Sequence, residues 1–163
     1  LALGDALAIS AMQYKKFGKF DFKKIHPAGN LGAQLKTVED IMLTGNKIPF
    51  VNENRKMSEA IKILSNKNLG ILIIQNKLKK TIGIVTDGQI RRFNQKKLNL
   101  LSMKVKEIMT KNPISVEKNS LAAKALALMN NKKITSLCVY DKKNKYKTIG
   151  VVHIHNILQY NIS

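Results

Sequence analysis

An internal duplication constrains the fold of this chain more than any other feature, because the same order of sequence patterns occurs twice. Val38–Met42 matches Val105–Met109, and each of these segments is followed by a short stretch that contains a proline. A helical pattern, an apolar strand, a second strand and another helical pattern then follow in both copies. Since a strand pair covered by helices on one face still exposes its other face, we expect the two copies to pack on each other.

The spacing of apolar residues assigns the elements of each copy. Residues 57–64 and 121–129 repeat at helical spacing, and we expect Ser58 and Ser120 to cap these two helices. Ile71–Ile74 is short, wholly apolar and rich in β-branching, which is typical of a buried strand. A polar turn leads from this strand into the next, which predicts a hairpin. The predicted fold class is therefore α/β of the α+β type, with each copy running strand, helix, strand, strand, helix.

Composition bounds the class of protein. The chain has 163 residues and is 44% hydrophobic, which is enough to build a packed core. It contains no apolar run of membrane-spanning length, so we expect a soluble protein without a membrane partner. Cys138 is the single cysteine and excludes an intramolecular disulfide, which favours a cytoplasmic location.

The net charge of +19 raises the question of nucleic-acid binding. Nearly all of this charge is lysine, spread from Lys15 to Lys147, and aromatic residues make up 6% of the chain with no tryptophan. This pattern favours a solvated surface over a nucleic-acid groove, so we expect no nucleic-acid partner. A basic surface still attracts anions, which keeps phosphates and nucleotides as the expected ligand class.

The repeated segment, the strand pair and the Gly-Ile-Val-Thr-Asp junction at 83–87 resemble the CBS domain family. Two such domains in tandem form a Bateman module, and the resemblance extends from Val38 to about Gln159. It implies that adenosine nucleotides or related ligands bind in clefts between the repeats and regulate an attached domain.

A second resemblance rests on four motifs in order: Leu3–Ala8, His26–Gly32, Asp40–Gly45 and Thr86–Arg92. They are similar to the C-terminal half of bacterial D-arabinose 5-phosphate isomerases, in which a sugar isomerase (SIS) domain precedes the CBS pair. These enzymes interconvert D-ribulose 5-phosphate and D-arabinose 5-phosphate for the synthesis of Kdo, a sugar of lipopolysaccharide and capsule.

This likeness implies three segments. Residues 1–36 are expected to be the last SIS helix and a linker, residues 37–98 the first CBS domain and residues 99–163 the second. The apolar start of the chain contains Asp5 and lacks a basic beginning, so we interpret it as a helix entered part-way rather than a targeting segment.

One histidine is the candidate catalytic residue of this chain. By resemblance, His26 falls on the active-site histidine of the isomerase family. The family's lysine, glutamates and phosphate-binding loop have no equivalent in residues 1–36, so we expect the chain alone to be non-catalytic. No cofactor is expected. His153 and His155 lack further metal ligands nearby, and we expect one in the cleft between the repeats and the other on the surface.

The ligand site is predicted where strands lead into helices. Thr86 offers a hydroxyl, and the helix that begins near Asp87 offers backbone N–H groups, which together suit an anion. By resemblance, nucleotide-binding CBS domains often carry an aspartate three residues after that threonine, but this chain has Gln89, and Asn156 in the second copy. Neutral amides favour a more anionic ligand. The pathway of the resembled isomerases implies CMP-Kdo as one candidate.

The role of the two arginines stays open in the sequence. Arg91 and Arg92 either contact a phosphate or form a solvated helix face. Because the two junctions differ in sequence, we expect two non-equivalent clefts, with His153, His155 and Asn156 at the second.

Two functions compete on this evidence. In the first, the pair senses a nucleotide or nucleotide sugar and adjusts an upstream isomerase domain. In the second, the pair is a structural spacer without a small-molecule ligand that serves the packing of a homo-oligomer.

Overall fold

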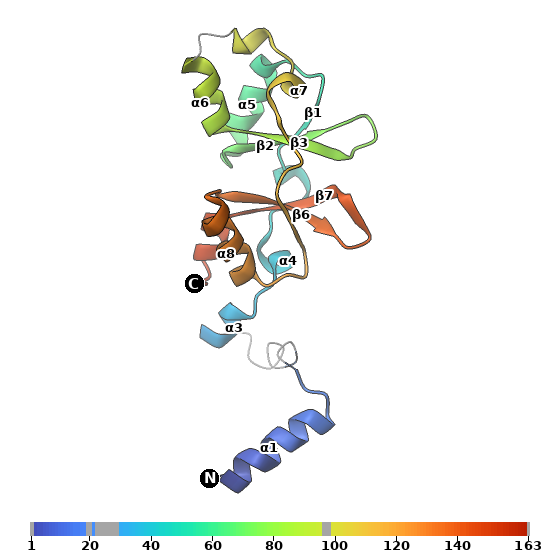
Figure 1. The fold of residues 1–163 in the computed structure, drawn as a ribbon, viewed down its shortest axis with the longest axis vertical. Helices are drawn as coiled ribbons and strands as arrows, with labels where there is room; N and C mark the ends of the chain where they lie inside the picture. The colour runs from blue at the N-terminus through green and yellow to red at the C-terminus, as the bar shows by residue number, and fades with distance from the viewer. Residues whose placement is uncertain (1, 19–20, 22–29, 96–98, 163) are drawn as a thin grey trace.

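The computed structural model describes residues 2–18, 21, 30–95 and 99–162, which form two small sheets with short helices (Figure 1). The first sheet has the strand order β1 (Phe50–Asn52), β2 (Ile71–Gln75), β3 (Thr81–Thr86), β4 (Thr110–Lys111). The second sheet has the order β5 (Ser115–Glu117), β6 (Ser136–Asp141), β7 (Asn144–His153). In both sheets the first strand pairs in parallel with the second, and the second and third strands form an antiparallel hairpin.

The helices follow the predicted order in both copies. They are α1 (Ala2–Tyr14), α3 (Asn30–Gln34), α4 (Val38–Ile41), α5 (Met57–Lys67), α6 (Asp87–Gln95), α7 (Val105–Ile108), α8 (Ala122–Lys132) and α9 (Ile154–Leu158), with 3-10 turns at Gly45–Lys47 and Leu100–Ser102. Each copy therefore runs strand, helix, strand, strand, helix, and the predicted α/β class is confirmed. The helix expected at the start of the chain is also present as α1, which buries none of its residues.

Strand β2 is apolar throughout because it is buried on both faces. Leu72 and Ile74 pack into the core of the first copy beneath α5. Ile71 and Ile73 face the other way, where they join Cys138 and other residues of the second copy in a third apolar cluster. The expected packing of the copies on each other is thus observed, sheet against sheet. A hydrogen bond of 2.8 Å between the hydroxyls of Thr81 and Thr148 adds to this contact.

The two copies exchange their short leading helices. Val38 and Ile41 of α4 are buried in the core of the second copy. Val105 and Ile108 of α7 are buried in the core of the first. Backbone hydrogen bonds fix both crossings. Val38 N–H donates to Ser120 O at 2.8 Å, and Val105 N–H donates to Arg55 O at 2.9 Å. The chain thus passes between the copies twice. The division into segments 1–36, 37–98 and 99–163 remains a prediction.

The exchange also explains why the two predicted serine caps are wrong. Helix α5 is capped by Lys56 and α8 by Leu121, and neither makes a side-chain cap hydrogen bond. The first N–H groups of these helices instead donate to carbonyls of the crossing segments, Met57 N–H to Met103 O at 2.9 Å and Ala122 N–H to Lys36 O at 2.8 Å. Backbone from the other copy therefore satisfies donors that a serine would otherwise serve.

No helix in the described ranges is both long and apolar enough to cross a membrane.

A glycine in each hairpin permits the close approach of a crossing segment. A Cβ on Gly83 would lie 2.8 Å from Thr110 O and 2.7 Å from Met109 Sδ. A Cβ on the equivalent Gly150 would meet the side chain of Met42 and would lie 3.2 Å from a backbone carbonyl. The segment that crosses at Gly83 lies closer to its hairpin than the segment that crosses at Gly150. The main obstacle at Gly83 is the backbone carbonyl of Thr110, which cannot rotate away.

We therefore expect Gly83→Ala to lower the free energy of unfolding by about 2 kcal/mol, since the methyl group forces β4 away from β3. Gly150→Ala should cost less, because the flexible side chain of Met42 can move. Urea denaturation followed by circular dichroism measures both changes.

Gly88→Ala is the matched control, because its Cβ would have no neighbour closer than 4.0 Å and alanine favours the helix α6. Equal losses for Gly83→Ala and Gly88→Ala would contradict a specific close approach at β3.

Candidate functional site

The site is built around two points at which a strand passes directly into a helix. Strand β3 ends at Thr86 and α6 starts at the next residue, while β7 ends at His153 and α9 starts directly after it. An amide three residues along closes each junction. Gln89 Oε1 accepts from Thr86 N–H at 2.9 Å, and Asn156 Oδ1 accepts from His153 N–H at 3.1 Å. Both amides thus act as helix caps that hold the strand end against the first turn.

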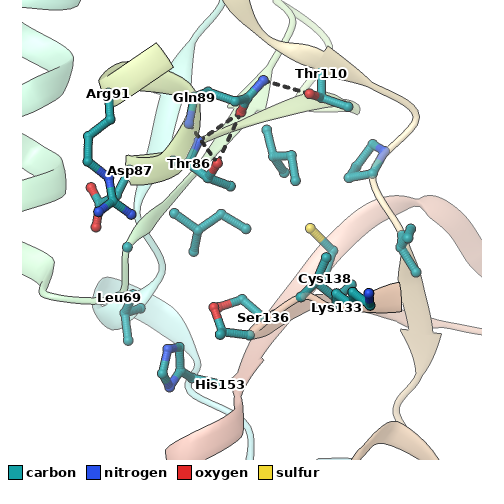
Figure 2. A pocket seen from close by; sticks show the side chains of 18 of the residues that line it. Leu69, Thr86, Asp87, Gln89, Arg91, Thr110, Lys133, Ser136, Cys138 and His153 are labelled. Atoms are coloured by element: carbon teal, nitrogen blue, oxygen red, sulfur yellow. Dashed lines mark hydrogen bonds between the residues drawn. The ribbon is translucent and has the colours of Figure 1, made fainter. Parts of the chain in front are cut away.

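Both the oxygen and the nitrogen of the Gln89 side-chain amide make hydrogen bonds. Its Nε2 donates to the hydroxyl of Thr110 at 2.6 Å (Figure 2), and it donates more weakly to Ile108 O at 3.4 Å. Gln89 therefore ties α6 to the crossing segment that leads from α7 into β5. An aspartate at this position could not donate these bonds.

A cavity of about 760 Å³ lies where the two junctions meet (Figure 2). It is lined from both copies by Asn68, Leu69, Gly70, Ile71, Ile84, Thr86, Asp87, Gly88, Gln89, Arg91, Arg92, Thr110, Asn112, Pro113, Ile114, Lys133, Ile134, Thr135, Ser136, Cys138, His153 and His155. The sequence predicted a separate cleft at each junction. In the structure, the face-to-face packing of the sheets brings residues of both strand ends to the wall of this cavity.

The structure gathers most of the residues predicted to bind a ligand. Thr86, Asp87, Gln89 and Arg91 line the cavity from the first copy, and His153 and His155 line it from the second. Asn156 is not among the lining residues, and its side-chain oxygen is bonded to the backbone of His153. His26 lies outside the described residues.

Positive charge dominates the cavity. Arg91 and Arg92 on α6 and Lys133 at the end of α8 contribute three cationic groups, against the single carboxylate of Asp87. Within the described ranges, neither arginine has a carboxylate at ion-pairing distance. The arrangement is suited to an anionic ligand.

The two histidines lie together at the second junction. Their ring centroids are 4.9 Å apart, and His153 Nδ1 accepts a hydrogen bond from His155 N–H at 3.2 Å. Burial, and then repulsion by His155, lower the pKa of His153 from its ordinary value. His153 is partly buried and His155 is exposed, but both line the cavity, so the expected split between cleft and outer surface is only partial. In the described part of the chain, no three metal-ligating side chains form a group.

Lys133, Ser136 and Cys138 are among the lining residues that sequence reasoning missed. Lys133 follows α8 in the left-handed conformation, with φ of 53°, which turns the chain into the cavity wall. Cys138 is buried, and this burial raises the pKa of its thiol to about 11, so it is neutral at physiological pH. Ser136 had a signal in the sequence, because it stands in the strand of the second copy where the first copy has Ile71.

Comparison with known proteins gives relatives over the whole chain. The family model for the CBS domain matches residues 38–96 and 105–163. An uncharacterised protein of Rickettsia prowazekii (strain Madrid E) is 37% identical over 163 residues, which is 100% of this chain and 50% of that protein. Arabinose 5-phosphate isomerase KdsD of Francisella tularensis is 39% identical over 161 residues (98% of this chain, 48% of that protein). KdsD of Yersinia pestis is 37% identical with the same coverage. The chain thus spans about half the length of these relatives.

Solved structures share the fold. CBSX2 in complex with AMP, a CBS-pair protein from Arabidopsis thaliana, has a TM-score of 0.67 at 22% identity, covering 77% of this chain and 95% of the other. A CBS domain pair in complex with 5'-methylthioadenosine and S-adenosyl-L-methionine has a TM-score of 0.67 at 24% identity, covering 77% and 94%. The tandem architecture predicted from the duplication is thereby confirmed.

We expect the free energy of unfolding to fall as the pH is lowered from about 7.5 towards 5.5. The unfolded chain takes up a proton on residue 153 near pH 6.5, whereas the folded chain resists it until the pH passes below the lowered pKa. Stability is therefore present above pH 6.5 and is lost as the pH falls through this interval.

His153→Gln should reduce this pH dependence, because the group that titrates differently in the two states is gone. Denaturant titrations at intervals of half a pH unit measure the slope. His155→Gln serves as the comparison, since it keeps His153 and removes only a repelling neighbour. An unchanged slope in His153→Gln would contradict the assignment.

Proposed function

The chain belongs to the CBS domain family, and from this premise we propose that it is the regulatory ligand-binding pair of an arabinose 5-phosphate isomerase, with a nucleotide or nucleotide sugar as its ligand. The observation that carries the proposal is the cavity between the copies, where three cationic side chains face one carboxylate. Its volume of about 760 Å³ is sufficient for a ligand of nucleotide size.

Each part of the cavity has a role in this proposal. Arg91 and Arg92 contact the phosphate of the ligand, and the hydroxyl of Thr86 adds a neutral donor, whereas the N–H of Asp87 already donates to Gly70 O at 3.1 Å. That hydroxyl is only weakly engaged, since its contact with Gln89 Oε1 is 3.4 Å long. His153 and His155 offer ring nitrogens from the opposite copy. Gln89 and Asn156 act by shaping the two junctions rather than by contacting the ligand.

The activity of a longer enzyme that contains this chain is proposed from the relatives. The likeness to KdsD extends over 98% of this chain, beyond the residues that the CBS model matches. We propose that an SIS isomerase domain precedes the pair in a cytoplasmic enzyme that interconverts D-ribulose 5-phosphate and D-arabinose 5-phosphate for Kdo and lipopolysaccharide synthesis. His26 is its proposed active-site histidine. CMP-Kdo is the proposed feedback ligand because it is an anionic nucleotide sugar of the same proposed pathway, and a homo-oligomer is the proposed assembly.

Ligand binding is tested by thermal unfolding of the chain with AMP, ATP, CMP and CMP-Kdo at millimolar concentration. A ligand that binds the folded state raises the unfolding midpoint, and at 100 times its dissociation constant it adds about 2.7 kcal/mol to the free energy of unfolding. The double variant Arg91→Gln and Arg92→Gln should lose most of this shift.

Arg55→Gln is the matched control, because Arg55 pairs with Glu59 on α5 and is not among the cavity residues. A chain whose midpoint moves with none of the four nucleotides would favour the structural spacer instead.

We also expect the purified chain to show no turnover of D-arabinose 5-phosphate, since the lysine, glutamates and phosphate-binding loop that would act with His26 belong to the proposed upstream domain. A coupled assay for D-ribulose 5-phosphate measures this, with a full-length KdsD as the positive control. Turnover by the chain alone would contradict the proposed division of labour.

A further inference from the structure

Two β-hairpins project from the same side of the molecule (Figure 1). One turns between β2 and β3, and the other turns between β6 and β7. The hydroxyls of Thr81 and Thr148 are 2.8 Å apart and join the two hairpins where they leave the sheets. The cavity lies at the opposite ends of β3 and β7, where Thr86 and His153 stand. The hairpin tips therefore form a surface that is separate from the cavity.

Lysines from both hairpins gather on this surface, although they lie far apart in the sequence. The exposed lysines of the two turns and of the start of β7 are Lys77, Lys79, Lys80, Lys142, Lys143, Lys145 and Lys147, and we call this group with its two tips the basic hairpin end. In the described ranges none of these lysines lies at ion-pairing distance from a carboxylate. Two acidic residues stand at the feet of the hairpins: Glu53, whose N–H donates to Gln75 O, and Asp141, which pairs with Lys118 at 3.1 Å. The uncompensated positive charge favours an anionic partner.

Each hairpin also exposes one large apolar or aromatic side chain. Leu78 is 76% exposed and Tyr146 is 69% exposed, and each has a lysine on both sides in the sequence. The first four residues of β7, 144–147, are all exposed, whereas a strand within a packed sheet would bury alternate residues. The second hairpin thus extends beyond the core, and the basic hairpin end is convex.

The chemistry of the basic hairpin end distinguishes between partners. A second copy of the same surface would be repelled by its charge. Single-stranded nucleic acid requires aromatic stacking platforms, but Tyr146 is the only aromatic residue of these turns, and Lys80 Nζ already lies 5.5 Å from its ring centroid. The phosphates of duplex DNA would match the lysines and leave Leu78 without a role. A bilayer offers anionic headgroups to lysine and an interfacial layer in which leucine and tyrosine are favourable.

We propose that the basic hairpin end docks this chain on the surface of an anionic phospholipid bilayer, with Leu78 and Tyr146 in the headgroup layer and the lysines among the lipid phosphates. The sequence predicted no membrane partner because no apolar run is long enough to cross a bilayer, but a protein that lies on the surface needs no such run. Docking at this end leaves the cavity at the opposite strand ends open to solvent.

The test is sedimentation of the full chain with large unilamellar vesicles. One set consists of phosphatidylcholine alone, and the other contains about 30% phosphatidylglycerol to provide a negative surface. We expect the chain to bind the anionic vesicles and not the zwitterionic ones. Binding should weaken as the salt concentration rises, because salt screens the attraction between lysine and lipid.

The contribution of charge is measured with the triple variant Lys77→Gln, Lys79→Gln and Lys145→Gln. It should weaken binding to the anionic vesicles roughly 100-fold, because three cations are removed from the lipid surface. The matched control removes the same charge from exposed positions on α5 and α8 that lie outside the hairpins and the cavity: Lys62→Gln, Lys124→Gln and Lys132→Gln. The control should change binding by no more than about threefold, the effect of net charge alone.

The contribution of the apolar tip is measured with Leu78→Ser. Because Leu78 is 76% exposed, the substitution removes no core contact, and circular dichroism should show an unchanged thermal midpoint. Binding to the anionic vesicles should weaken roughly tenfold, since the leucine side chain no longer leaves water for the interface.

Four outcomes overturn the proposal: no binding to anionic vesicles, equal binding to both vesicle types, equal losses in the hairpin triple variant and its control, or full binding by Leu78→Ser. Tighter binding to a duplex oligonucleotide than to anionic vesicles, impaired by the hairpin triple variant but not by Leu78→Ser, assigns the surface to nucleic acid and also overturns it. None of these results bears on the proposed function, because none of the substituted residues lines the cavity.

Discussion

Apolar contact between the two sheets determines where every other part of this molecule lies. Ile71 and Ile73 of β2 face Cys138 of β6 and Val151 of β7, so each strand pair covers the sheet face that the helices of the other copy leave open. Burial of this surface removes several large aliphatic side chains from water. The same packing brings the ends of β3 and β7 together. The cavity is thus a consequence of how the core closes, since it lies where the apolar cluster ends and the two strand-to-helix junctions begin.

The exchange of α4 and α7 makes the two copies dependent on each other. Each short helix completes the core of the other copy, and each crossing segment supplies carbonyls to the first turn of a longer helix. Gly83 and Gly150 allow these segments to approach the hairpins, and Met42 and Met109 fill the space that the missing side chains leave. A shift in the relative position of the copies therefore disturbs cores, caps and cavity together. This coupling is what a regulatory module requires if ligand binding is to be felt beyond the cavity.

The sequence predicted the elements well because their signals are local. Helical periodicity in residues 57–64 and the wholly apolar Ile71–Ile74 depend on neighbours in the chain, and the duplication added the face-to-face packing. The serine caps were wrong because the real partners of those N–H groups come from the other copy, which no local pattern contains. The cavity shared by both junctions, and the positions of Lys133 and Ser136 in its wall, depend on how the copies are placed in space. A polar residue aligned with Ile71 was the one sign in the sequence that pointed to the second of these residues.

Gln89 connects the cap to the cavity in a way that an aspartate could not. Its oxygen holds the end of β3, while its nitrogen donates to Thr110 on the crossing segment that continues through Pro113 and Ile114 along the cavity wall. A carboxylate would keep the first bond but could not donate the second, and would add a negative charge to a cavity whose charged groups are mostly cationic. The amide thus leaves the positive field of Arg91 and Arg92 unopposed at this point. It also fastens the wall of the cavity to the helix that carries those arginines. Movement of α6 towards a bound anion would therefore act on the crossing segment directly, through one short hydrogen bond of 2.6 Å.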